Sequence, residues 1–187
     1  MPHFLISGIP DLVARTGAAL EEHGSTFVGV DDIDDVPTVC AGIADATFDG
    51  YVQLSATITA GGDTAIGRIH HFFADGVLAR FPAMSAALPT LRAGARITFV
   101  MGVLPPEVST ADDVAARAAL VRVLGHAARA DGPADLRIQV LEADATPQEI
   151  AQAALGRRPE VEGPEDVLDR SYADWRVELL GMVAADG

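Results

Sequence analysis

The chain has 187 residues, which is enough for one domain with a substantial core and too few for two of ordinary size. Hydrophobic residues make up 49% of it and the mean hydropathy is +0.25, yet the formal net charge is −14. A chain this acidic is poorly suited to nucleic acid, because phosphate binding needs clustered Lys and Arg. We therefore expect no nucleic-acid partner.

The N-terminal half alternates short apolar runs with one amphipathic stretch. Pro10 opens a predicted helix that stops near Gly24. The predicted strands are Phe4–Ser7, Phe27–Val30, Thr38–Ile43 and Tyr51–Ser55, and residues 57–64 are a predicted loop.

The C-terminal half continues the alternation. A helical pattern covers Ala65–Leu91, although Gly76, Pro82 and Pro89 should break or kink it. The remaining predicted elements are a strand at Arg96–Val100, a helix at Thr110–Ala130, a strand at Leu136–Leu141 and a helix at Pro147–Leu155. A charged linker then precedes a last helix, Glu165–Val183, which carries Tyr172 and Trp175.

Strands that alternate with helices predict an α/β fold, a Rossmann-like doubly wound parallel sheet in a single domain. We place this domain at residues 1–155, truncated at its C-terminal end, and a linker with a terminal helix at 156–187.

Two residue types are missing: the sequence contains no lysine and no asparagine, so all 13 basic residues are arginine. Schiff-base catalysis and a Walker-type phosphate lysine are therefore excluded. Cys40 is the only cysteine, which excludes an intramolecular disulfide and a cysteine-based metal cluster, and we expect it to be a buried thiol.

No signal-peptide pattern and no apolar run of roughly 18 residues occur. The expectation is a soluble, cytoplasmic protein without a membrane partner.

Residues 3–155 resemble the short-chain dehydrogenase/reductase family. The segments that carry the resemblance are Phe4–Gly8, Asp49–Ala56, Ala86–Pro89 with Gly94–Ile97, and Ala115–Leu120. They match, in order, the first strand with its Thr-Gly start, the strand before the Asn-Asn-Ala-Gly turn, the elements before the catalytic serine, and the helix of the catalytic lysine. The resemblance implies a Rossmann fold built to bind a dinucleotide.

The glycine fingerprint is degenerate. Its first position is Gly8, but its second falls on Leu12 and its third on Ala14. An acidic residue after the second strand, Asp31 or Asp32, lies where a ribose hydroxyl is bound in such folds. Gly8, Asp31 and Asp32 are thus weak candidates for cofactor binding, and no cofactor is predicted.

The catalytic tetrad that the family implies, Asn-Ser-Tyr-Lys, is also missing. By alignment, the tyrosine falls on Asp113 and the lysine on Arg117, whereas the serine falls on Met101 or Gly102 and the asparagine near Gly76. Asp113 and Arg117 are four apart on a helix, so they remain weak catalytic candidates, with a surface ion pair as the favoured interpretation.

Two further clusters carry chemistry-bearing side chains. His70 and His71 are weak acid/base candidates, and only His71 with Asp75 has helical spacing for a shared metal ion. The four aspartates Asp31, Asp32, Asp34 and Asp35 lack the pattern of a calcium loop and predict a solvated acidic loop. We expect no metal site.

Two Ala-rich segments, Ala79–Leu91 and Val114–Ala128, are apolar on more than one face. In the resembled family the corresponding helices form the subunit interface. The sequence therefore predicts a non-catalytic subunit that forms homo-oligomers or pairs with an active family member acting on acyl or polyketide-type substrates. Two alternatives stay open: a cofactor-independent cyclase, isomerase or dehydratase using Asp113, Arg117, His70 or His71, and a nucleotide sensor.

Overall fold

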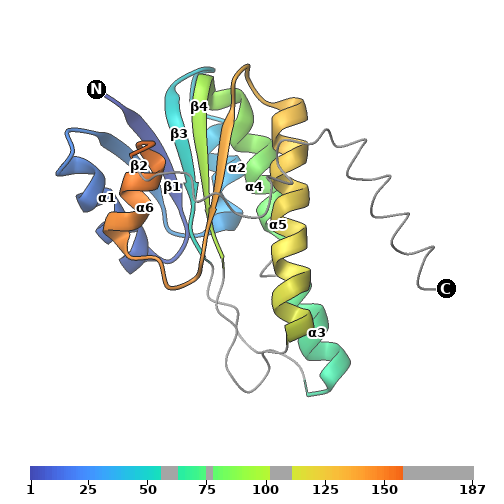
Figure 1. Cartoon of the computed structure of the whole chain (residues 1–187). Coiled ribbons are helices and arrows are strands. Elements are labelled where there is room, and N and C mark those ends of the chain that lie inside the picture. Colours follow the sequence, from blue (N-terminus) through green and yellow to red (C-terminus); the bar gives the residue numbers. More distant parts are fainter. Residues whose placement is uncertain (56–62, 75–77, 102–110, 158–187) are drawn as a thin grey trace.

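The structure is a computed structural model that describes residues 1–55, 63–74, 78–101 and 111–157, without the side chains of 65, 68, 69, 72 and 111–118 (Figure 1). The strands are β1 (His3–Ser7), β2 (Thr26–Val30), β3 (Phe48–Gln53), β4 (Leu91–Val100) and β5 (Arg137–Leu141). The helices are α1 (Pro10–Glu21), α2 (Val36–Cys40), α3 (Ala65–Phe73), α4 (Arg80–Ala87), α5 (Ala111–Asp131) and α6 (Pro147–Ala154), with short 3-10 turns η1 (Ile33–Asp35) and η3 (Leu88–Thr90).

The five strands form one parallel sheet in the order β2-β1-β3-β4-β5. Figure 1 shows helices on both faces of it: α1 and α6 on one, and α2, α4 and α5 on the other. The predicted single-domain, Rossmann-like parallel sheet is confirmed. Because all strands run the same way, their carboxyl ends share one edge of the sheet, hereafter the carboxyl edge, and their starts share the amino edge.

Apolar side chains of the strands lie on both faces of the sheet because helices cover both faces. Along β1, Leu5 belongs to the core under α2, α4 and α5, whereas its neighbours Phe4 and Ile6 belong to the core under α1 and α6. Side chains alternate between the two faces with a period of two residues. The two cores together hold the sheet between the helical layers.

The predicted strand at Thr38–Ile43 is wrong, because its first three residues belong to α2. Pro37 occupies the first turn of the helix, where its missing N–H costs nothing. Val36 and Cys40, four residues apart, are buried on one side, while Thr38 is exposed. Burial at a spacing of four residues is typical of a helix. The chain therefore passes from β2 to β3 through α2, without an intervening strand.

The other elements match the predictions apart from their ends, except that the predicted helical region Ala65–Leu91 is divided into α3, α4 and η3. β4 begins at Leu91, five residues before the predicted strand, and takes the last residue of the predicted helical region. Pro82 does not break α4, because it lies in the first turn of that helix. Gly76, residues 56–62 of the predicted loop, and the linker and terminal helix beyond Arg157 lie outside the described residues.

Two expectations from composition can be compared with the fold. Cys40 is a free and buried thiol, as predicted, and burial raises its pKa. In the described part of the chain, no helix has the length and apolar character needed to cross a bilayer.

Thr98, on β4, supplies a test of the core under α1 and α6. Its side chain is 1% exposed and its hydroxyl makes no hydrogen bond. Replacing the hydroxyl by a methyl group in Thr98→Val removes an unsatisfied buried polar group, so we expect the free energy of unfolding to rise by about 1 kcal/mol. Urea unfolding of the full chain measures the change.

Thr90→Val is the matched control. The Thr90 hydroxyl is equally buried but donates a 2.6 Å hydrogen bond to the Ala87 carbonyl. The same substitution there should lower stability by about 1 kcal/mol. If both substitutions lowered the free energy of unfolding, the hydroxyl of Thr98 would have a hydrogen-bond partner after all.

Candidate functional site

The carboxyl edge of the sheet is the place where open α/β folds bind ligands, at the point where the strand order reverses. Here the reversal lies between β1 and β3, because β2 follows on one side and β4 and β5 on the other. Gly8 directly follows β1 and Leu54 directly follows β3 at this point of the carboxyl edge. Asp31, another predicted cofactor-binding position, follows β2, the neighbour of β1 on the other side.

Gly8 is required by the backbone around it. Its φ is +145°, a conformation that L side chains rarely adopt, and its N–H donates to the Val30 carbonyl at 3.1 Å. On the other side, the N–H of Leu54 donates to the Ser7 carbonyl at 2.8 Å, and a Cβ at Gly8 would lie only 2.7 Å from the Cβ of Leu54. The backbone conformation and the close approach of Leu54 therefore explain the glycine at this position without a cofactor.

The start of α1 is poorly arranged for a pyrophosphate. The helix begins at Pro10, two residues after Gly8, so its first residue has no N–H to donate. Asp11 adds a carboxylate to the first turn and pairs with Arg15 at 3.5 Å on the surface. Leu12, at the second fingerprint position, is partly buried against the core under α1 and α6. A helix N-terminus attracts anions through free N–H groups, and a carboxylate there repels them.

The acidic cluster after β2 is a solvated turn, as predicted. All four aspartates are exposed. The side chain of Asp32 accepts a 3.0 Å hydrogen bond from the backbone N–H of Asp34 and so caps η1. One carboxylate oxygen of Asp32, Oδ1, therefore has a local structural role.

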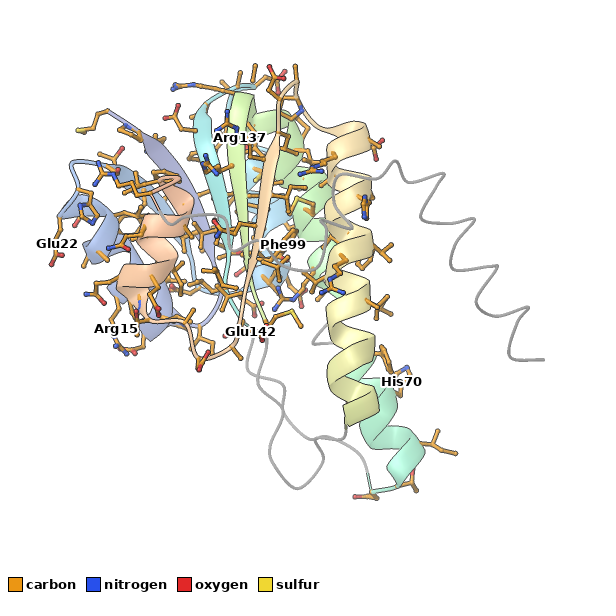
Figure 2. The ribbon with its side chains drawn as sticks, viewed as in Figure 1. Arg15, Glu22, His70, Phe99, Arg137 and Glu142 are labelled. Atoms are coloured by element: carbon orange, nitrogen blue, oxygen red, sulfur yellow. The ribbon has the colours of Figure 1, made fainter. Side chains whose placement is uncertain are left out.

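The four candidate acid/base residues lie on α3 and α5 rather than on the loops after β1 and β2. His70 and His71 are exposed on α3, with ring centroids 5.9 Å apart in an edge-to-face arrangement. Figure 2 places His70 at the end of the molecule beyond the carboxyl edge, well away from the sheet residue Phe99. Asp113 and Arg117 lie in the first half of α5, and their side chains, like Asp75, are outside the described residues.

No group of three or more His, Cys, Asp or Glu side chains that could hold a metal ion occurs among the described residues. The described part of the chain thus offers no metal centre.

A buried polar network, which was not predicted from the sequence, lies just below the carboxyl edge. The hydroxyls of Ser7 and Tyr51 share a hydrogen bond of 2.7 Å. Gln53 Nε2 donates to Tyr51 Oη and to the Arg80 carbonyl, both at 3.3 Å. Arg80 in turn donates from Nη1 to Gln53 Oε1 at 3.4 Å and from Nη2 to the Val100 carbonyl at 3.0 Å. The network ties the ends of β1, β3 and β4 to the first residue of α4.

Tyr51 is not placed to act as a general acid or base. It is fully buried, and burial raises its pKa to about 12, against the lowering by hydrogen bonds from Ser7 and Gln53. A general acid/base needs access to substrate and a pKa near the working pH. The network is therefore structural.

The raised pKa of Tyr51 predicts a loss of stability at high pH. Below pH 10 the phenol is protonated in both folded and unfolded chains, so it has no pH-dependent effect. Between about pH 10 and pH 12 only the unfolded chain releases the proton, and stability falls with rising pH. Tyr51→Phe removes the group, so its denaturation midpoint should fall less over this range than that of the unsubstituted chain.

A groove lies between α4 and α5, toward the amino edge of the sheet. Its volume is about 780 Å³. Thirteen residues of α4, η3, the start of β4, the end of α5 and the following turn line it, mostly with apolar side chains: Phe81, Pro82, Met84, Ser85, Leu88, Pro89, Leu91, Leu124, Ala127, Ala128, Asp131, Gly132 and Pro133. This groove, hereafter the α4–α5 groove, lies between the two Ala-rich helices.

Comparison with known proteins identifies the fold. No protein-family model and no curated protein matches the sequence. Among solved structures, lin1944 from Listeria innocua is similar over 87% of this chain and 95% of its own, with a TM-score of 0.60 and 14% identity. BdcA (YjgI) from E. coli is similar over 85% of this chain and 91% of its own, with a TM-score of 0.52 and 22% identity.

BdcA in complex with NADPH is similar over 83% of this chain and 86% of its own, with a TM-score of 0.54 and 18% identity. At these identities the likeness shows a shared fold.

Proposed function

We propose that this protein is a non-catalytic relative of the short-chain dehydrogenases whose function is assembly through α4 and α5. The observation that carries the proposal is the α4–α5 groove, an apolar surface on the two helices that form the subunit interface in the resembled family. The large apolar side chains of the groove, such as Met84 and Leu124, are already buried, so a partner would contact the exposed residues of its lining, among them Pro82, Ser85 and Pro89.

The carboxyl edge supports the same proposal by contrast. Hydride-transfer chemistry of the resembled kind needs a lysine and an asparagine, and the sequence has neither. The tyrosine nearest the edge, Tyr51, is buried, and the start of α1 presents Pro10 and Asp11 to any phosphate. The partner is a second copy of this chain or an active short-chain dehydrogenase, whose substrate would be of acyl or polyketide type.

The test is size-exclusion chromatography with mass detection, on the chain alone and on the chain co-expressed with an active short-chain dehydrogenase. We expect a stable oligomer in at least one case. Ser85→Arg, which puts a charge into the groove at an exposed position, should dissociate it. Ala18→Arg, the same kind of change at an exposed position of α1, should not. A monomer in every case, or equal effects of the two variants, overturns the proposal.

A nucleotide sensor is the second candidate, favoured by the fold shared with BdcA, which was solved in complex with NADPH. Calorimetric titration of the full chain with NADPH and NADH distinguishes the two. We expect no binding heat, because of the geometry at the start of α1. Tight binding, lost on Asp31→Ala, would favour the sensor.

A further inference from the structure

The outer edge of β5 is one end of the sheet. β5 pairs with β4 on one side, and no described strand lies on its other side. Figure 1 shows this orange strand between α6 and α5. Proteins usually protect an edge strand with a proline, a bulge or a charged side chain, because its outward N–H and C=O groups are unpaired. β5 has no proline and no charged residue after Arg137, and its register with β4 is regular, so this edge is open to a further strand.

The hydrogen bonds to β4 show which backbone groups of β5 face outward. The carbonyl of Leu141 accepts from the N–H of Met101 at 2.9 Å, so the backbone groups of Leu141 point toward β4. Successive residues of a strand point their N–H and C=O groups to alternate sides, so those of Ile138 and Val140 point away from the sheet. Within the described part of the chain, these outward groups have no hydrogen-bond partner.

The sequence of β5 is complementary to itself about a two-fold axis through Gln139. In an antiparallel pair centred there, Ile138 of one copy opposes Val140 of the other. Because these are the outward-facing residues, each such pair exchanges two N–H···O=C bonds, four in all. Their side chains are only partly buried against the core under α2, α4 and α5, and β-branched cross-strand pairs of this kind are favourable. On the other face, the side chains of Gln139 from the two copies meet.

Charge favours the antiparallel arrangement over the parallel one. β5 begins with Arg137 and is followed by Glu142, both exposed, and Figure 2 shows the two residues at opposite ends of the strand. Antiparallel pairing brings the Arg137 end of each copy to the Glu142 end of the other, whereas parallel pairing would place like charges side by side. β2, at the other edge of the sheet, begins at Thr26 and is followed by an acidic cluster, so it lacks the cation for such a pair.

We propose that the outer edge of β5 is a self-association surface. Two copies of the chain pair their β5 strands in antiparallel fashion about a two-fold axis at Gln139, and their two five-stranded sheets become one continuous sheet. None of the residues that line the α4–α5 groove belongs to β5, so this inference goes beyond the proposed function and does not depend on it.

Gln139→Arg tests the pairing, because it places two arginines against each other at the two-fold axis. Size-exclusion chromatography with mass detection should show that the mass of the assembly falls by half. Gln152→Arg, the same change at an exposed position of α6, should leave the mass unchanged. A monomer of 19.5 kDa for the unsubstituted chain at every concentration, or equal effects of the two variants, overturns the proposal.

A charge exchange tests the antiparallel register. Arg137→Glu and Glu142→Arg should each raise the dissociation constant several-fold in sedimentation velocity, because each places like charges at both ends of the paired strands. The two substitutions together should restore the dissociation constant of the unsubstituted chain. A double variant that associates as weakly as either single variant overturns the antiparallel pairing.

A disulfide tests the position of the axis. Opposed residues of a non-hydrogen-bonded antiparallel pair have Cα atoms about 4.5 Å apart, which suits a disulfide. Gln139→Cys should therefore give a cross-linked dimer on mild oxidation, whereas Gln152→Cys should remain a monomer on a non-reducing gel. The native Cys40 is buried, so it should not contribute.

The same measurements separate this surface from the groove. If Ser85→Arg dissociates an assembly while Gln139→Cys gives no cross-link and Gln139→Arg has no effect, the β5 pairing is wrong and the assembly function stands. If Gln139→Cys gives the cross-link and Ser85→Arg leaves the mass unchanged, the β5 pairing stands and assembly through the groove is wrong.

Discussion

Arg80→Met is expected to lower the free energy of unfolding by about 3 kcal/mol. Arg80 is 3% exposed, and its guanidinium satisfies the carbonyl of Val100 and the amide oxygen of Gln53. Methionine fills much of the same space with an apolar side chain but leaves both oxygens without these donors in a site from which water is excluded. Urea unfolding followed by circular dichroism measures the loss.

Arg92→Met is the matched control, because Arg92 also donates to a side chain and to a carbonyl, those of Asp49 and Ala46. Its side chain is 50% exposed, so water replaces the lost bonds. We expect a change within about 1 kcal/mol. Similar losses for the two variants would mean that the buried network contributes no more than a surface ion pair.

The buried network also predicts coupling between its members. Gln53 bridges Tyr51 and Arg80, so Tyr51→Phe and Arg80→Met should not be additive in stability. A double-mutant cycle should give an interaction energy of about 1 kcal/mol.

Gly8→Ala should lower the free energy of unfolding by about 3 kcal/mol, for two reasons that add. The alanine must adopt a φ of +145°, which its Cβ disfavours. The same Cβ must also displace Leu54, whose Cβ is rigidly tied to the backbone of the neighbouring strand and whose side chain is fully buried. Thermal and urea denaturation both report the loss.

Gly24→Ala separates the two reasons. Gly24 has a φ of +74°, but nothing lies within 4 Å of a Cβ added there. This variant carries only the conformational cost, about 1 kcal/mol. If Gly8→Ala were no worse than Gly24→Ala, the close approach of β1 and β3 at the carboxyl edge would be looser than the structure shows.

The fold was predictable because its signals are local. β1, β2 and β5 are short apolar runs, and Pro10 and the Thr146–Glu149 capping box mark where α1 and α6 begin. The segment 36–43 was misread because Val and Thr favour strands, and this preference outweighed Pro37, which signals a helix start or an edge.

The site was less predictable because its contacts join residues far apart in the sequence. Arg80 and Gln53 are 27 positions apart, and Ser7 and Tyr51 are 44 apart. An arginine is seldom fully buried, so nothing in the sequence near Arg80 signals its place inside the molecule. The absence of lysine and asparagine, by contrast, can be read directly from the sequence, since it does not depend on which residues are close in the fold.

The pairing of α6 with α1 sets the order in which a newly made chain can be completed. Phe4, Ile6, Val13 and Leu20 are synthesised first, but part of their cover, Ile150 and its neighbours on α6, is synthesised more than a hundred residues later. The opposite face receives α2, α4 and α5 in the meantime. Until Pro147–Ala154 has been synthesised, the nascent chain keeps one apolar sheet face partly open, and this is the interval in which a chaperone has most to bind.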